Sequence, residues 1–218
     1  MKNKYKYILF DWDGCLAKTL DIWLRVYKEL CVERGIKIGR LNDFEIVEKS
    51  FGKWAPGLAN LGIKDADVAY KEAVDKVMVE YGRVNLYPNA ENTLLKLKNK
   101  NKKLALLSSS FRAWIDKPLK YRHFNKYFDF IIGRDEVKNG KPDPEQIFRA
   151  MDNLDADKQS TLIIGDSDHD IKAGHAANIC TVLYYPVENH RFYSEEFLRE
   201  QNPNYVIDNL LDLIKIIN

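Results

Sequence analysis

Residues 8–16 constrain the fold of this chain more than any other segment, because two carboxylates follow directly on a short apolar run. The segment reads Ile-Leu-Phe-Asp-Trp-Asp-Gly-Cys-Leu and places Asp11 and Asp13 two positions apart. The apolar run predicts a buried strand, and α/β sheets bind their ligands at the carboxyl ends of such strands. Gly14 carries no Cβ, so the backbone there can come close to a bound group. Asp11 is therefore a candidate nucleophile.

Short apolar runs recur along the chain and predict a sheet. Together with residues 7–10, they lie at residues 104–107, 130–132, 162–164, 181–184 and 205–207. Apolar residues at three- and four-residue spacing predict helices between most of these runs, at residues 89–99, 144–153, 171–178 and 210–217. Alternating strands and helices are typical of the α/β class, and they predict a Rossmann-like, doubly wound parallel sheet with helices on both faces.

The first crossover of this sheet is unusually long. Residues 17–86 show only helical patterns, at residues 19–34, 42–50, 55–60 and 65–81. One crossover helix needs far fewer residues, so we expect an inserted α-helical bundle that stands over the strand ends. The sequence thus predicts an α/β core domain made of residues 1–16 and 87–218, and a helical cap domain made of residues 17–86.

The composition argues against a nucleic-acid or membrane partner. The chain has 34 basic and 32 acidic side chains, and the resulting net charge of +2 produces no strong field. Its three cysteines, Cys15, Cys31 and Cys180, lack the spacing of metal ligands, and residues 1–7 lack the apolar stretch of a signal peptide. We therefore expect a cytoplasmic protein, a monomer or a weak homodimer, whose partner is a small molecule.

Residues suited to phosphate chemistry follow four of the predicted strands. They are Asp11 and Asp13 after the first strand, Ser108, Ser109 and Ser110 after residues 104–107, Lys141 in a Gly-Lys-Pro-Asp-Pro segment, and Asp166, Asp168 and Asp170 after residues 162–164. The carboxyl ends of parallel strands open on the same edge of a sheet. We therefore expect these side chains to converge, although they lie far apart in sequence.

Such a cluster of carboxylates predicts a metal ion. Several carboxylates in one pocket repel a phosphate dianion unless a cation intervenes, and hard oxygen ligands favour Mg²⁺. Lys141 would neutralise further charge, while the Ser108 hydroxyl and the backbone amides near Asp13, Gly14 and Ser109 are placed to hold phosphoryl oxygens. Asp11 could then attack phosphorus in line and form an aspartyl phosphate that water cleaves.

The four motifs together resemble those of the haloacid dehalogenase superfamily, subfamily I, in particular its phosphatases of the phosphoglycolate phosphatase and β-phosphoglucomutase type. The resemblance covers essentially the whole chain. It implies a Mg²⁺-dependent phosphomonoester hydrolase that acts on a small phosphorylated metabolite. The helical insertion matches the helical cap of that family, which closes over the site and excludes water.

The resemblance also implies a role for each motif residue. Asp11 would be the nucleophile and Asp13 the general acid and base, while Ser108 and Lys141 would bind the phosphoryl group. The metal would be held by Asp11, by the backbone carbonyl of Asp13 and by Asp166, with Asp170 in a supporting position.

Two other functions use similar residues. A β-phosphoglucomutase-like phosphomutase has the same four motifs, and its phosphoenzyme waits for a second substrate hydroxyl instead of water. A phospho-receiver signalling module also gathers acids, a hydroxyl and a lysine around Mg²⁺. Receivers, however, are about half as long, place the phosphorylated aspartate after the acidic pair, and have no helical insertion after the first strand. A phosphatase is therefore favoured, with the mutase as the alternative.

The residues that select the substrate are predicted to lie outside the motifs. Phe51-Gly52-Lys53-Trp54 occupies a turn between two predicted helices of the insertion, where the family places a specificity loop. Lys53 beside Trp54 could meet a carboxylate or sugar hydroxyls, and Arg112, just after the serine run, could face the leaving group. These three residues are candidates for substrate specificity.

Overall fold

A computed structural model describes residues 4–217 of the chain, so residues 1–3 and 218 of the predicted core domain lie outside the described residues. Its sheet has six parallel strands in the order β3-β2-β1-β4-β5-β6. The strands are β1 (Tyr7–Phe10), β2 (Lys103–Leu107), β3 (Phe130–Ile132), β4 (Thr161–Gly165), β5 (Cys180–Tyr184) and β6 (Tyr205–Ile207). The predicted α/β class and all six predicted strands are confirmed.

The sheet is buried because successive strand residues face two apolar layers. Ile8 and Phe10 of β1 pack into one buried cluster, whereas Leu9 between them packs into another on the opposite face. The register pairs Ile8 with both Leu104 and Leu162, so equivalent residues of neighbouring strands reach the same layer. A sheet buried on both faces explains why its strands read as continuous apolar runs.

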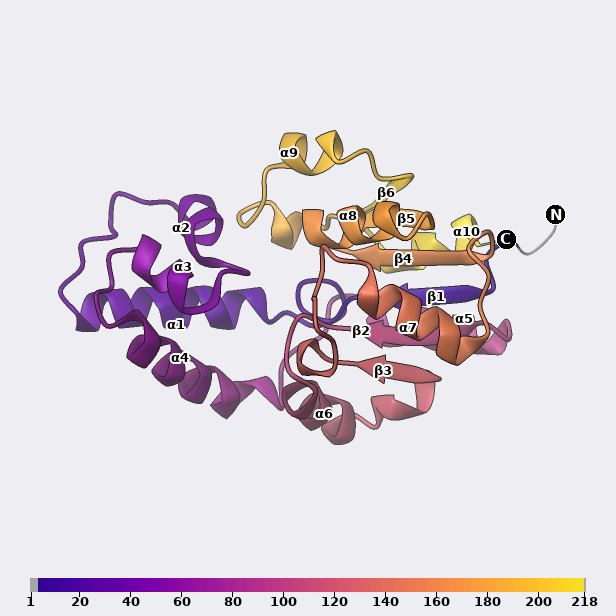
Figure 1. Ribbon diagram of the computed structural model, residues 1–218, viewed down its shortest axis with the longest axis horizontal. Helices are drawn as coiled ribbons and strands as arrows, with labels where there is room; N and C mark the ends of the chain where they lie inside the picture. The colour runs from indigo at the N-terminus through magenta and orange to yellow at the C-terminus, as the bar shows by residue number, and fades with distance from the viewer. Residues whose placement is uncertain (1–3, 218) are drawn as a thin grey trace.

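Helices cover both faces of the sheet (Figure 1). The helices of the core are α5 (Ala90–Asn99), α6 (Arg112–Tyr121), α7 (Glu145–Leu154), α8 (Asp168–Ala176), α9 (Glu195–Glu200) and α10 (Leu213–Ile216). Short 3₁₀ turns accompany them at η1 (Phe124–Tyr127), η2 (Arg134–Glu136), η3 (Val187–Asn189) and η4 (Leu210–Asp212). Among the described helices, none is both long and apolar enough to cross a bilayer.

Three details of the helical prediction were wrong. The helix expected from residue 171 begins at Asp168, because Ser167 and Asp170 form a capping box that starts it earlier. The helix expected over residues 210–217 is divided into η4 and α10. Helices α6 and α9 were not anticipated, since α6 contains Pro118 and α9 has only six residues.

The insertion consists of four helices, which Figure 1 shows beside the sheet at the side to which the arrowheads of β1–β4 point. They are α1 (Leu20–Glu33), α2 (Asp43–Ser50), α3 (Trp54–Asn60) and α4 (Ala66–Tyr81). Its two connections to the core run side by side, with Lys18 N donating to Asn85 O at 2.8 Å and Tyr87 N to Leu16 O at 3.0 Å. We call α1–α4 the helical insertion. Its predicted division from the core at residues 16/17 and 86/87 stays a prediction.

Candidate active site

The carboxyl ends of four segments open into one cavity of about 630 Å³ between the sheet and the helical insertion. The motif residues that line it are Asp11, Asp13, Ser109, Ser110, Lys141, Asp166 and Asp168. Strand β1 lies between β2 and β4, where the strand order reverses direction, and such a switch point is the usual ligand crevice of a doubly wound sheet. The fold therefore brings together residues separated by more than 150 positions, as expected.

Lys141 joins two of the aspartates in a buried ion-pair network. Its Nζ lies 2.5 Å from Oδ1 of Asp11 and 2.6 Å from Oδ1 of Asp170, and it also donates to the carbonyl of Leu107 at 3.1 Å. The three charged side chains are at most 5 % exposed. The lysine is thus held at the first strand end by both carboxylates, and water cannot easily replace it.

The pKa values of the three groups in this network are shifted from their ordinary values, and not all in the same direction. Burial by itself lowers the pKa of Lys141, but Asp11 and Asp170 together raise it above its ordinary value. Burial opposes ionisation of Asp170 too, yet the Lys141 ammonium outweighs it and lowers the pKa of that carboxyl. For Asp11, burial raises the pKa well above the usual range despite Lys141, and the nearby carboxylates add to the rise.

Asp166 lies close to Asp11 because Gly14 leaves room for it. Gly14 has a φ of +87°, and a Cβ placed on it would fall 2.1 Å from Oδ2 of Asp166. This close approach, together with the positive φ, requires glycine at that position. The Gly14 amide itself donates to the Ala17 carbonyl at 2.9 Å, so Gly14 contributes space here and no free donor for a phosphoryl oxygen.

The carboxylates of Asp11, Asp166 and Asp170 suit a hard cation. Each of them offers an oxygen within 4.8 Å of the others. Oδ2 of Asp11 and Oδ2 of Asp166 are buried without any hydrogen-bond partner among the described residues. Burial, followed by repulsion from Asp11, raises the pKa of Asp166 well above its ordinary value. A divalent cation would satisfy both unpartnered oxygens and offset this repulsion, so the residues fit Mg²⁺.

Asp170 has less free capacity than the other two. Its Oδ1 accepts from Lys141, and its Oδ2 accepts from the Ser167 hydroxyl at 2.6 Å and from the Ser167 amide at 3.3 Å. Asp170 therefore orients Lys141 and caps α8, whereas Asp11 and Asp166 keep an oxygen available for a cation.

Asp13 is surrounded by three hydroxyl groups. Its Oδ1 accepts from Tyr81 Oη at 2.7 Å, and its Oδ2 accepts from Ser108 Oγ at 3.0 Å and Ser110 Oγ at 2.9 Å. Ser108, expected on the phosphoryl group, is fully buried and faces Asp13, while Ser109 is exposed and lines the cavity. The structure thus directs the buried hydroxyls of the serine run at the candidate acid–base residue.

Tyr81 was missed in the sequence for a physical reason. It continues the buried face of α4 that Ala69, Ala73 and Val77 form at four-residue spacing. This spacing identifies Tyr81 as a core residue, and its ring is indeed completely buried. Only the fold shows that its hydroxyl reaches Asp13.

The three predicted specificity residues differ in position. Lys53 and Trp54 line the cavity, and the Nζ of Lys53 donates to the backbone carbonyl of Glu48 at 2.5 Å. Their loop lies over the core, since a Cβ on Gly52 would be 3.1 Å from the His169 ring. Arg112 does not line the cavity, and its guanidinium donates to Asp116 at 3.0 Å and to the Ile131 carbonyl at 2.8 Å. The structure therefore does not bring Arg112 to the site.

Several residues that line the cavity carried no recognisable signal in the sequence. Most of them are aromatic, on the helical insertion, on α6 and on the segment before α9, and Arg134 lies on the core side. Aromatic residues at helical spacing usually form a core, which is why the sequence did not distinguish them.

Comparison with known proteins places the chain in a family. The sequence pattern of the haloacid dehalogenase-like hydrolases matches residues 8–184. The pyrophosphatase PpaX of Halalkalibacterium halodurans is 33 % identical over 223 residues, which cover 96 % of this chain and 95 % of that protein.

Solved structures agree with this assignment. A haloacid dehalogenase-like hydrolase from Bacteroides fragilis superposes with a TM-score of 0.80 at 25 % identity, over 96 % of this chain and all of that one. A predicted phosphoglycolate phosphatase from Haemophilus somnus has the same fold, with a TM-score of 0.81 at 20 % identity over the whole of both chains. The chain therefore belongs to the haloacid dehalogenase-like hydrolase family, and it is a phosphatase of that family.

Proposed function

We propose that this protein hydrolyses a small phosphomonoester through an aspartyl phosphate on Asp11, with Mg²⁺ as its cofactor. The observation that supports this proposal most directly is the environment of the two oxygens of the Asp11 carboxylate. One oxygen is fixed by Lys141, and the other is buried without a partner, beside Asp166 and at the cavity that Asp13 lines. A carboxylate that a lysine orients at one oxygen, and whose other oxygen is available to a cation, is positioned to attack phosphorus.

Asp11 and Asp166 would hold the metal, with the backbone carbonyl of Asp13 as the family resemblance implies. When bound, Mg²⁺ supplies positive charge that neutralises the carboxylates and the transferring phosphoryl group. Lys141 keeps its proton beside Asp11, because the two carboxylates raise its pKa. It would therefore stay cationic and orient Asp11 for attack on phosphorus.

Asp13 would handle the protons of both steps. In the first step, a carboxylate oxygen of Asp11 forms a bond to phosphorus, the bond from phosphorus to the leaving oxygen breaks, and Asp13 protonates that oxygen. In the second step, Asp13 removes a proton from water, the water oxygen attacks phosphorus, and the Asp11 carboxylate leaves. The donors Tyr81, Ser108 and Ser110 hold Asp13 in place between these steps.

The helical insertion would act as the cap over this site, because it supplies the wall of the cavity opposite Asp11. The PpaX relatives are named pyrophosphatases, and the Haemophilus somnus structure is described as a predicted phosphoglycolate phosphatase. Inorganic pyrophosphate, a phosphoanhydride, and phosphoglycolate, a phosphomonoester, are therefore candidate substrates to be compared with other phosphomonoesters. The cytoplasmic location and the monomeric or weakly dimeric state remain predictions.

Rapid quench with a ³²P-labelled phosphomonoester tests the chemistry directly. With Mg²⁺ we expect transient label on Asp11, located by peptide mapping, and no label or turnover in Asp11→Asn. Addition of EDTA should abolish turnover, and restored Mg²⁺ should recover it. Label on another residue, or full activity in EDTA, would contradict the proposal.

A further inference from the structure

The wall of the cavity opposite Asp11 is aromatic. Trp23 of α1 lies nearly parallel to Tyr70 of α4, with ring centroids 6.4 Å apart and 8° between the planes. The ring centroid of Trp54 lies 5.8 Å from that of Tyr70. The ring centroid of Trp114, on the core, lies 6.3 Å from that of Trp23. All four residues line the cavity. A continuous aromatic surface therefore runs from the specificity loop through the helical insertion to α6.

This wall carries little charge. The only charged residues that the described helical insertion adds to the cavity are Lys53 and Glu48, which have opposite signs. The Nζ of Lys53 moreover donates a hydrogen bond to the backbone carbonyl of Glu48. A second phosphate or a carboxylate on the substrate would thus find no excess of cations on the insertion. Removing this anionic group from water there would cost free energy that no ion pair with the insertion offsets.

The wall also offers unused hydrogen-bonding groups. Among residues 4–217, no protein group hydrogen-bonds the hydroxyls of Tyr27 or Tyr70, and both residues line the cavity. Trp54 adopts a φ of +56°, an uncommon conformation for a bulky side chain. A strained tryptophan and two unpaired tyrosine hydroxyls at the same cavity are features of a binding surface more than of a packed core.

The size of the cavity fits the same interpretation. Its volume of about 630 Å³ lies within the range of roughly 300–1,000 Å³ found for pockets that bury organic ligands. A molecule as small as pyrophosphate or phosphoglycolate would occupy the acidic end and leave the aromatic wall uncovered.

We propose that the substrate is an organic phosphomonoester whose alcohol carries a flat, uncharged aromatic or heteroaromatic ring, and that Trp23, Trp54, Tyr70 and Trp114 bind this ring. The proposal rests on the proposed phosphatase function. It adds that the specificity of the site comes from ring stacking, with Tyr27 and Tyr70 available for polar atoms on the ring edge.

Two esters with matched chemistry test the proposal in the wild-type enzyme with Mg²⁺. Phenethyl phosphate and cyclohexylethyl phosphate have primary alcohol leaving groups and the same carbon skeleton, but only the first ring is flat. Because aromatic pairs contribute about 0.5–1.5 kcal/mol beyond area burial, we expect kcat/KM to be about two- to tenfold higher for phenethyl phosphate. Inorganic pyrophosphate and phosphoglycolate should be poorer substrates than either ring ester.

Ethyl phosphate serves as the common reference, since it reaches the acidic end and not the wall. Trp23→Leu and Trp54→Leu, on two different helices, should reduce the preference for the flat ring toward one, with each kcat/KM expressed relative to that of the same variant for ethyl phosphate. Phe148→Leu is the matched control, because Phe148 is 39 % exposed on α7 and does not line the cavity. It should keep the wild-type preference.

The outcomes separate the two proposals. Equal rates for the two ring esters, or a preference for the more hydrophobic cyclohexyl ester, would overturn the ring-binding proposal. Highest kcat/KM for pyrophosphate or phosphoglycolate would overturn it too, while leaving the phosphatase mechanism intact. Phosphate release from none of the compounds would instead overturn the proposed function.

Discussion

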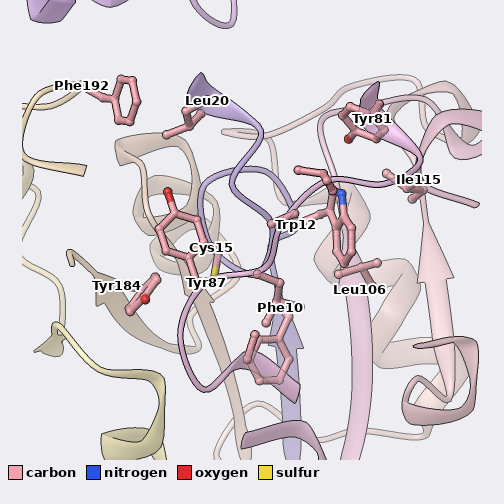
Figure 2. Close-up of a cluster of buried hydrophobic side chains, with 14 of the residues drawn as sticks. Phe10, Trp12, Cys15, Leu20, Tyr81, Tyr87, Leu106, Ile115, Tyr184 and Phe192 are labelled. Atoms are coloured by element: carbon pink, nitrogen blue, oxygen red, sulfur yellow. The ribbon is translucent and has the colours of Figure 1, made fainter. Parts of the chain in front are cut away.

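The hydroxyl of Tyr81, the last residue of α4, donates a 2.7 Å hydrogen bond to Oδ1 of Asp13, which follows β1. The ring of Tyr81 belongs to a buried cluster that also contains Trp12 and Leu106 (Figure 2). The helical insertion and the candidate acid–base residue are therefore joined by one buried contact. A rigid ring fixes where the hydroxyl lies, and the hydroxyl in turn orients the Asp13 carboxylate.

Tyr81→Phe is expected to lower kcat by about tenfold with little change in KM, since a hydrogen bond to a charged group contributes roughly 1.5–3 kcal/mol. The larger change Asp13→Asn should slow turnover by roughly 10²- to 10⁴-fold. Tyr121→Phe, at an exposed tyrosine of α6, should behave as wild type.

The leaving group distinguishes positioning from general damage. If Tyr81 orients Asp13, the defect of Tyr81→Phe should be larger for an alkyl phosphate than for p-nitrophenyl phosphate, whose leaving group needs no proton. A defect of equal size on both substrates would show that Tyr81 acts only through packing.

Asp166→Asn should raise the melting temperature of the metal-free protein by on the order of a few degrees. Burial and Asp11 raise the pKa of Asp166 in the folded state, so this carboxyl lowers the free energy of unfolding at pH values above its unfolded-state pKa, and the amide removes that cost. The gain should disappear at acidic pH, where the carboxyl is protonated.

Mg²⁺ should reverse the order of the melting temperatures of the wild type and Asp166→Asn. We expect Mg²⁺ to stabilise the wild type and to have little effect on Asp166→Asn, because ligand binding stabilises only a protein that retains its site. Asp168→Asn is the control, since Asp168 pairs with Lys172 near the surface at 2.6 Å. Thermal unfolding with EDTA and with Mg²⁺ measures both effects, and equal Mg²⁺ stabilisation of wild type and Asp166→Asn would exclude Asp166 as a ligand.

Lys141→Met should lower the free energy of unfolding by about 3–5 kcal/mol, because it leaves Asp11 and Asp170 buried without their cation. Lys172→Met breaks a partly exposed pair of similar length and should cost less than about 1 kcal/mol. Urea unfolding of the metal-free proteins measures the difference. Similar losses in the two variants would mean that the Lys141 network is not desolvated as described.

Phosphatase and phosphomutase activity can be separated with β-glucose 1-phosphate and a trace of the bisphosphate. We expect free phosphate as the main product, if any reaction occurs, because Lys53 and Glu48 are the only charged residues that the described helical insertion adds to the cavity, so the second phosphate of a bisphosphate finds no excess of cations there. Coupled assays for inorganic phosphate and glucose 6-phosphate measure both products. Glucose 6-phosphate formed much faster than phosphate would make the protein a mutase.

The sequence alone was sufficient to predict the α/β class, the six strands and the helical character of residues 17–86. Each of these depends on local patterns: apolar runs for buried strands, three- and four-residue spacing for helices, and residue types at strand ends. The convergence of Asp11, Asp13, Lys141 and Asp166 was also predictable, because parallel strands bring all their carboxyl ends to one edge.

Tertiary structure alone decided what each side chain contacts there. The buried hydroxyl of Ser108 donates a hydrogen bond to Asp13. Arg112 donates to Asp116 and to the carbonyl of Ile131, outside the cavity. The aromatic wall combines Trp23, Tyr70 and Trp114 from three helices, and each of these looks like an ordinary core residue in its own segment. The spacing of apolar residues along a segment indicates that a residue is buried. Whether it is buried against a neighbouring helix or at a cavity depends on how separate elements pack, and no single segment of the sequence contains that information.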